Sequence, residues 1–145
     1  MLTPLVLVNK RADVALAAGA DGVQLGGRSL DPADARRLLG AGKWVGASVH
    51  SAAEARAAAA AGAGFLLAGP VFATPSHPGS EGGGAALIEE LVRCGRPVVA
   101  IGGVTPARLA ALRSAGAAGI AAIRGIWEPR STGAAVRRYL EAWQA

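Results

Sequence analysis

Residues 97–123 read PVVAIGGVTPARLAALRSAGAAGIAAI and carry the signals of a strand, a helix and a second strand. The apolar run at 97–101 is followed by two glycines, then by Thr105 and a proline that suit a helix start, and by Gly116 at its end. A second apolar run follows at 119–123. Apolar runs without polar alternation are typical of parallel strands buried on both faces. The stretch therefore predicts a βα unit that leads into the next strand.

The same pattern recurs along the whole chain. Asp31 and Ser51 are N-cap candidates before alanine-rich segments, and Glu54 completes a capping box with Ser51. The helix ends AAGADGV, AAGAGF and SAGAAGI are alike, so a βα unit of about 20 residues is repeated. This alternation predicts an α/β fold with six strands and six helices. The predicted strands are 4–8, 22–25, 44–49, 65–68, 97–101 and 119–123.

Strict alternation leaves two architectures open, a doubly wound sheet or part of a (β/α)₈ barrel. No glycine fingerprint for a dinucleotide follows the first strand, where the sequence is NKRADVALAAG. Gly-rich and polar segments instead follow three strands, as GPVFATPS, AIGGVTP and AAIRGI. A barrel has its active site at these carboxyl ends of the strands. We therefore expect one domain over residues 1–145, an incomplete TIM (β/α)₈ barrel with six of eight βα units.

Composition excludes several classes of protein. A chain with 52% hydrophobic and 17% charged residues is expected to be globular. The net charge of +5 comes without a basic stripe, and aromatic residues are only 4%, so nucleic acid is not an expected partner. No apolar run approaches the roughly 18 residues of a membrane span, and no signal peptide is recognised, which predicts no membrane partner and a cytoplasmic location. The single cysteine, Cys94, cannot form an internal disulfide.

A phosphate site is predicted after the last two strands. Gly102 and Gly103 leave backbone N–H groups bare near a helix start, and Ile123 and Arg124 follow the next strand. Barrels build phosphate sites from the loops after their last two strands, and an arginine there can bind an anion. The alternative is that the two glycines only form a tight turn and that Arg124 is a surface cation.

In this order, the segments resemble the thiamine phosphate synthase and thiazole tautomerase (TenI-like) superfamily. The resemblance runs from LVNKRADVALAAGADGVQLG through GASVHSAAEA and GPVFATPSHPG to PVVAIGGVTPARLAALRSAGAAGIAAI. It implies a phosphate-binding barrel of thiamine biosynthesis that binds a carboxythiazole phosphate and, in the synthases, a hydroxymethylpyrimidine diphosphate. By this resemblance Thr74 and Ser76 contact the diphosphate or the thiazole carboxylate, and Ser48 lies where the synthases contact the diphosphate. Gly102 and Gly103 match the backbone site for the thiazole phosphate.

The resemblance also implies two Mg²⁺-binding aspartates in synthases, and this chain has Lys10 and Ser29 at those positions. Because Mg²⁺ prefers hard oxygen ligands, no cofactor is expected, and Mg²⁺ only if the chain is a synthase. Asp31 is close in sequence, but its place before a proline better suits a helix cap. We therefore favour the tautomerase-like branch, with synthase activity or non-catalytic binding of a phosphorylated ligand as alternatives.

The tautomerase branch places its proposed catalytic histidine where this chain has Pro70, which cannot transfer a proton. The remaining candidates for proton transfer are His50, His77 and Glu81. His50 also fits a structural histidine at a strand end, and the other two fit solvated loop residues. Binding of a small phosphorylated heterocycle is thus the first expectation, and turnover, as a tautomerase or a degenerate synthase, the second. A different phosphate-binding barrel, such as a phosphosugar isomerase, is a further alternative.

The family's barrel has two more βα units before the segment with which this sequence begins. The predicted strands 4–8 and 119–123 would then each lack a neighbour on one side. Unpaired parallel edges beside apolar runs favour self-association. The chain is therefore expected to be a homodimer or to depend on a missing N-terminal segment.

Overall fold

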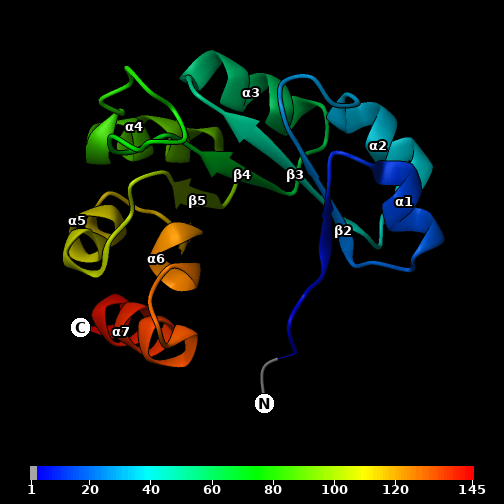
Figure 1. Ribbon diagram of the computed structural model, residues 1–145. Helices are drawn as coiled ribbons and strands as arrows, with labels where there is room; N and C mark the ends of the chain where they lie inside the picture. The colour runs from blue at the N-terminus through cyan, green and yellow to red at the C-terminus, as the bar shows by residue number, and fades with distance from the viewer. Residues whose placement is uncertain (1–2) are drawn as a thin grey trace. The chain divides into compact units, whose positions relative to one another are not determined.

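A computed structural model of the chain describes residues 3–145, which divide into two compact units. Unit 1 contains the residues through Leu67 together with Cys94–Arg96, and unit 2 contains Ala68–Arg93 and Pro97–Ala145. Each strand is followed by a helix (Figure 1), so the predicted α/β alternation is confirmed. The elements are β1 (Leu7–Asn9), α1 (Ala12–Ala17), β2 (Gly22–Leu25), α2 (Pro32–Leu39), β3 (Trp44–Val49), α3 (Ala52–Ala60), β4 (Phe65–Ala68), α4 (Gly84–Leu91), the 3₁₀ helix η1 (Val92–Cys94), β5 (Val98–Ile101), the 3₁₀ helix η2 (Pro106–Arg108), α5 (Leu109–Ser114), β6 (Gly119–Ala121), α6 (Arg124–Trp127) and α7 (Thr132–Gln144).

In unit 1 the strands are parallel, and β2 lies between β1 and β3. The register places Asn9, Gln24 and Gly46 side by side on these three strands. Paired residues point to the same face, and successive residues of a strand point to opposite faces. The side chains of this row therefore share one face of the sheet, and their neighbours in the chain share the other.

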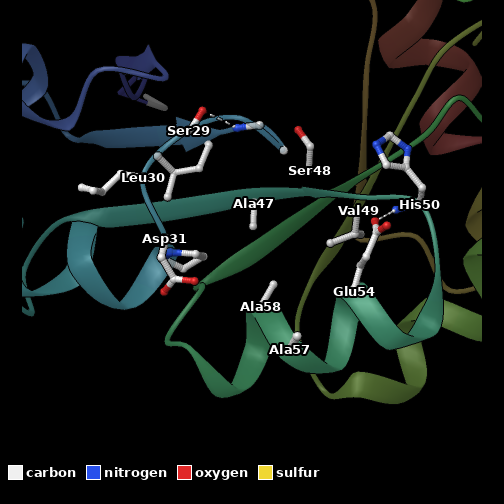
Figure 2. Close-up of a pocket in the computed structure, with 14 residues that line it drawn as sticks. Ser29, Leu30, Asp31, Ala47, Ser48, Val49, His50, Glu54, Ala57 and Ala58 are labelled. Atoms are coloured by element: carbon white, nitrogen blue, oxygen red, sulfur yellow. Dashed lines mark hydrogen bonds between the residues drawn. The ribbon is translucent and has the colours of Figure 1, made fainter.

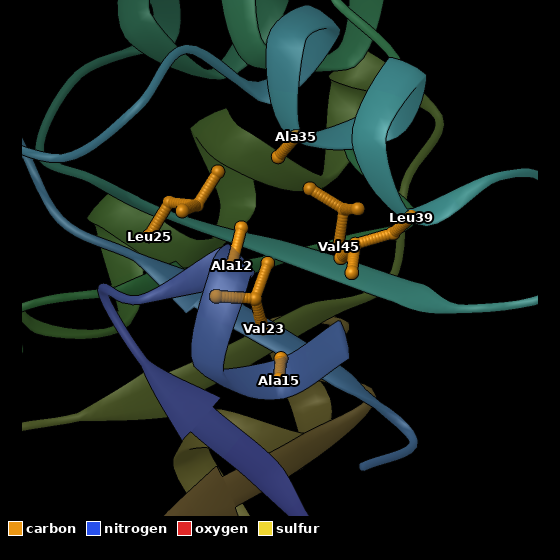
Figure 3. Packing of buried hydrophobic residues seen from close by; sticks show 7 residues of the cluster. All are labelled: Ala12, Ala15, Val23, Leu25, Ala35, Leu39 and Val45. Carbon is orange, nitrogen blue, oxygen red and sulfur yellow. The ribbon is translucent and has the colours of Figure 1, made fainter. Parts of the chain in front are cut away.

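The core of unit 1 lies between the second face and helices α1 and α2 (Figure 3). Small alanine side chains on the helices let them approach the valine and leucine side chains of the strands. The opposite face, which we call the inner face, carries Asn9, Gln24, Gly46 and Ser48. The cluster of the core consists of Ala12, Ala15, Val23, Leu25, Ala35, Leu39 and Val45, with Val8 and Ala20 packed against it.

In unit 2, β5 and β6 are parallel, with Ile101 beside Ala121. The Gly69–Pro70 peptide after β4 is cis. The Val71 N–H donates to the Ile101 carbonyl at 2.9 Å, which holds the segment after β4 beside the end of β5. Helix α7 packs against α5, α6 and η2. None of the helices in residues 3–145 is long and apolar enough to cross a membrane.

Two predicted helix caps are confirmed and one is wrong. Asp31 accepts the Ala33 N–H at 2.8 Å at the start of α2, and Ser51 accepts the Glu54 N–H at 3.3 Å at the start of α3. Thr105 makes no side-chain cap hydrogen bond. The N–H that such a cap would satisfy, that of Arg108, donates instead to the Thr105 carbonyl at 2.9 Å, so this helix begins with a 3₁₀ turn.

Two strands are each two residues shorter than predicted, and β5 begins one residue later than its predicted run. The run at 4–8 gives a strand only from Leu7, because the Val6 N–H donates to the Asp21 carboxylate at 2.7 Å and Leu5 is exposed. The run at 119–123 ends as a strand at Ala121, because Ile123 already occupies the N-cap position of α6. The first strand is thus shortened at its amino end, and the last strand at its carboxyl end, where a turn leads into α6.

Candidate functional site

Gln24 is a polar, partly buried residue on the inner face of unit 1. Its Nε2 donates to Ser48 Oγ at 3.1 Å and to the Leu25 carbonyl at 3.2 Å. Its Oε1 is buried and accepts no hydrogen bond within residues 3–145. Gly46 makes room for this amide, because a Cβ there would overlap Oε1 and the Phe65 ring. A buried acceptor without a partner costs about 1–3 kcal/mol, so Oε1 is suited to receive a donor from a bound molecule.

Lys10 and Ser29 meet beside Gly26, at the ends of β1 and β2. Lys10 has a positive φ of 68°, and its N–H donates to the Gln24 carbonyl at 2.8 Å. Ser29 Oγ accepts the Gly26 N–H at 3.0 Å. Lys10 Cε and Ser29 Oγ each lie 3.9 Å from the point where a Cβ on Gly26 would stand. The two residues at the aspartate positions of the synthases are thus brought together in the fold.

Their chemistry does not fit the magnesium ion that the resemblance implies for a synthase. An ammonium group has no lone pair to offer, and the Ser29 hydroxyl already accepts a backbone N–H. Asp31 is engaged as the cap of α2. Within residues 3–145, no group of three or more His, Cys, Asp or Glu side chains is arranged to hold a metal ion.

A pocket of about 360 Å³ lies in unit 1 between the loop that precedes α2, the end of β3 and helix α3 (Figure 2). Its walls include Ala47 and Val49 of β3 and Ala57 and Ala58 of α3. Small-molecule sites have volumes of about 300–1,000 Å³, so the pocket is at the small end of that range. Polar and ionisable side chains border it as well, namely Ser29, Asp31, Ser48, His50 and Glu54.

The polar groups at the edge of this pocket are used in local structure. Glu54 Oε2 accepts the His50 N–H at 2.7 Å, which fixes the turn between β3 and α3. Ser48 projects from β3 on the side opposite to Ala47, as Figure 2 shows. Ser48 and His50 therefore both border the pocket, but the hydroxyl of Ser48 belongs to the inner face with Gln24.

In unit 2 the turn after β5 requires glycine at two successive positions. Gly102 has φ of 96° and Gly103 has φ of 60°, both in the region that favours glycine. A Cβ on Gly102 would lie 2.7 Å from Pro70 Cα, and a Cβ on Gly103 would lie 2.6 Å from the Ala73 carbonyl oxygen. The segment after β4 therefore packs directly against the backbone of the glycine turn.

The carbonyl groups of this turn are satisfied within the chain, but its donors are not. The Gly102 carbonyl accepts the Phe72 N–H at 3.0 Å, and the Gly103 carbonyl accepts Arg108 Nη1 at 2.7 Å. Within residues 3–145, the N–H groups of Gly102 and Gly103 donate to no other group of the chain. Successive bare N–H groups in a turn form a concavity that suits an anion.

Arg124 is the first residue of α6, and Ile123 is its N-cap. The Ile123 side chain is exposed, and the Arg124 guanidinium lies 3.6 Å from the Glu128 carboxylate. An exposed ion pair of this kind contributes little free energy, so Arg124 can exchange Glu128 for an anionic ligand.

The loop after β4 places Thr74, Ser76 and His77 in one turn. Thr74 Oγ1 accepts the Ser76 N–H at 3.4 Å, and the Thr74 carbonyl accepts the His77 N–H at 3.0 Å. Ser76, His77 and Glu81 are exposed. The Thr74 hydroxyl thus lies against the backbone of Ser76, whereas His77 and Glu81 have the surroundings of solvated loop residues. Their proposed roles in catalysis stay predictions.

Arg108 and Tyr139 support the glycine turn and were not singled out from the sequence. The Arg108 guanidinium lies 4.4 Å from the centre of the Phe72 ring, and Tyr139 Oη donates to the Val104 carbonyl at 2.8 Å. An arginine in the first helical turn after paired glycines is a signal that could have identified Arg108. Tyr139 is 35 residues from its partner, and no local pattern indicates it.

Parallel βα units with glycine-rich turns at the strand ends are typical of (β/α) barrel proteins. Within that class, the chain belongs to the thiamine monophosphate synthase family, whose model matches residues 3–126. The superfamily identified from the sequence is therefore confirmed.

Curated relatives and a solved structure agree with this assignment. The bifunctional thiamine biosynthesis protein ThiM/ThiE of Symbiobacterium thermophilum is 46% identical over 139 residues, which cover 94% of this chain and 29% of the relative. The thiamine-phosphate synthase of Anaeromyxobacter dehalogenans is 46% identical over 143 residues, which cover 97% of this chain and 64% of the relative. The chain thus spans less than two thirds of either relative.

The thiamine phosphate pyrophosphorylase from Pyrococcus furiosus superposes with a TM-score of 0.86 at 33% identity, over 97% of this chain and 67% of that structure. The expected fold class, an incomplete (β/α)₈ barrel with six βα units, is confirmed by this similarity together with the alternation of strands and helices.

Proposed function

We propose that the chain takes part in the formation of thiamine phosphate by binding a phosphorylated thiazole, with the phosphate at the Gly102–Gly103 turn of unit 2. The observation that carries this proposal is the pair of successive N–H donors without an acceptor in the described chain. A phosphate oxygen supplies the acceptors that such a turn lacks. Relatives named thiamine-phosphate synthase support a thiazole phosphate as the source of that group.

Synthase chemistry has more support than the tautomerase-like function favoured from the sequence. The similar proteins carry the name of the synthase or pyrophosphorylase activity. Pro70 stands where the tautomerase branch has its proposed histidine, and it packs against Gly102. The proposed reaction is transfer of the hydroxymethylpyrimidine group to the thiazole phosphate, with pyrophosphate as the leaving group.

A second candidate is binding of the same ligand without turnover. The observation that favours it is the chemistry of Lys10 and Ser29, which does not fit the metal ion of a synthase. The two candidates share the binding site and differ only in whether product forms.

Isothermal titration with the thiazole phosphate tests the binding site that the two candidate functions share. The wild-type chain is expected to bind, and Gly103→Ala is expected to lose at least tenfold in affinity, about 1.4 kcal/mol, because the new Cβ meets the Ala73 carbonyl. Gly119→Ala is the matched control, since a Cβ there meets nothing within 4 Å. Arg124→Gln should also weaken binding, with Arg130→Gln as its control. Binding of a pentose phosphate in place of the thiazole would contradict the proposal.

Incubation with both substrates, followed by chromatography of thiamine phosphate, separates the two candidates. Product formation supports the synthase. Tight binding of the thiazole phosphate without product supports the second candidate.

A further inference from the structure

Lys10 has a backbone conformation that lysine rarely adopts. With φ of 68° it is the one non-glycine residue with positive φ among residues 3–145. The left-handed region costs a residue with a Cβ roughly 1–2 kcal/mol. The hydrogen bond from its N–H to the Gln24 carbonyl holds it there. Strained backbone of this kind is concentrated at functional sites, so the conformation points to a role for the side chain.

The charge of Lys10 is not neutralised within the described chain. Lys10 forms no ion pair in residues 3–145, and several acids of unit 1 have other partners. Asp13 binds Arg11 with oxygen–nitrogen distances of 2.5 and 2.8 Å, and this hydrogen bond lowers the pKa of Asp13 to about 2. Asp21 accepts a backbone N–H, and Asp31 caps α2. An exposed cation is left at the end of β1.

Ser29 supplies a second donor beside Lys10. Its oxygen accepts the Gly26 N–H, so its own proton is directed to another partner. Both side chains approach the point where Gly26 lacks a Cβ, at 3.9 Å each. The Lys10 atom at this distance is Cε, the carbon that carries the ammonium group. Phosphate oxygens accept hydrogen bonds from ammonium and hydroxyl groups.

We propose that the Lys10 ammonium takes the place of a divalent ion in unit 1, so that Lys10 and Ser29 bind a pyrophosphate group without metal. The inference deepens the proposed function and rests on it, since the diphosphate belongs to the second substrate of that reaction. Two aspartates need a cation between them and the ligand, because carboxylates repel phosphate. A lysine ammonium and a serine hydroxyl can donate hydrogen bonds to the phosphate oxygens directly, without a bridging cation.

Isothermal titration of inorganic pyrophosphate into the full chain tests this, first with a chelator and then with Mg²⁺. Binding is expected in the chelator, with less than a tenfold gain on adding Mg²⁺. Lys10→Met should lose at least tenfold in affinity, about 1.4 kcal/mol. Lys43→Met, which removes the other lysine of the chain, should bind as the wild type does. Wild-type binding only in Mg²⁺, or a Lys10→Met variant that binds normally, would overturn the inference.

A double variant, Lys10→Asp with Ser29→Asp, gives an independent test. It should lose pyrophosphate binding in the chelator and regain it in Mg²⁺, because it restores two oxygen ligands. Binding by this folded variant in the chelator would rule out a role for Lys10. Circular dichroism establishes that each variant is folded.

Titration of the thiazole phosphate in parallel separates this inference from the proposed function. If pyrophosphate binds only with Mg²⁺ while the thiazole phosphate binds normally, the inference about Lys10 and Ser29 is wrong and the proposed function still holds. If pyrophosphate binds without metal but the thiazole phosphate does not bind, the proposed function is wrong and the inference about Lys10 and Ser29 still holds.

Discussion

Tyr139 of α7 donates a 2.8 Å hydrogen bond to the carbonyl of Val104, the residue that follows the glycine turn. Tyr139 is 7% exposed, and Gly125 of α6 leaves the space for its hydroxyl, which a Cβ there would overlap. The C-terminal helix of unit 2 thus holds the backbone on which the proposed phosphate site is built.

Tyr139→Phe is expected to lower the free energy of unfolding by about 1–2 kcal/mol, because it leaves the buried Val104 carbonyl without a donor. Urea unfolding followed by circular dichroism measures the change. Leu140→Ala, at an exposed neighbouring position of α7, should stay within about 0.5 kcal/mol of the wild type. Equal effects of the two substitutions would show that the hydrogen bond from Tyr139 does not contribute measurably to the free energy of unfolding.

Stability should also fall at alkaline pH in a way that depends on Tyr139. Burial raises the pKa of Tyr139 above its ordinary value, so the folded state keeps this proton after the unfolded state has lost it. The unfolded state then binds fewer protons, and the free energy of unfolding decreases as pH rises through about 10. Urea unfolding between about pH 9 and pH 11 measures the slope, which Tyr139→Phe should reduce. An identical slope in both proteins would assign the effect to other groups.

Lys10→Gly should be more stable than Lys10→Ala by about 1 kcal/mol, because only glycine relieves the left-handed backbone. Both variants remove the ammonium, so both should bind pyrophosphate poorly. Thermal and urea unfolding of the pair measure the difference. If the Lys10→Ala variant is as stable as the Lys10→Gly variant, the positive φ of 68° is not a source of strain.

The exposed segment before β1 is expected to cause self-association. Leu5 and Val6 are 57% and 61% exposed, next to the first strand of unit 1. Contiguous apolar residues beside a strand edge are sites of pairing between chains. Leu5→Glu with Val6→Glu should shift the chain toward monomer in size-exclusion chromatography with light scattering. Leu38→Glu on α2, which is similarly exposed, is the control, and a monodisperse wild-type monomer would contradict the expectation.

The sequence predicted the strands best where both faces are covered. The predicted runs 22–25, 44–49 and 65–68 match β2, β3 and β4 residue for residue, because such strands are mostly apolar and are followed by glycine or a polar residue. The run at 4–8 was placed too early, since its first residues are apolar but exposed. Hydrophobicity alone does not distinguish a buried residue from an exposed apolar one.

The candidate site was predicted in part. The glycines after β5 and the altered metal positions could be recognised as local signals and from the family resemblance. The meeting of Lys10 and Ser29 beside Gly26 could not, because it depends on a backbone angle that lysine rarely adopts. The unpaired Gln24 Oε1 was also missed, since its burial depends on Gly46 and Phe65 of the neighbouring strands.

The packing of residues 70–73 against Gly102 and Gly103 limits how this protein can change its ligand over evolutionary time. Any side chain at either glycine would collide with backbone atoms that cannot move aside like a flexible side chain. The donors of the turn are main-chain groups, which substitution does not alter. In the proposed site, new selectivity is therefore expected at surrounding positions such as Thr74, Ile123 and Arg124, while the main-chain donors proposed for the phosphate stay the same.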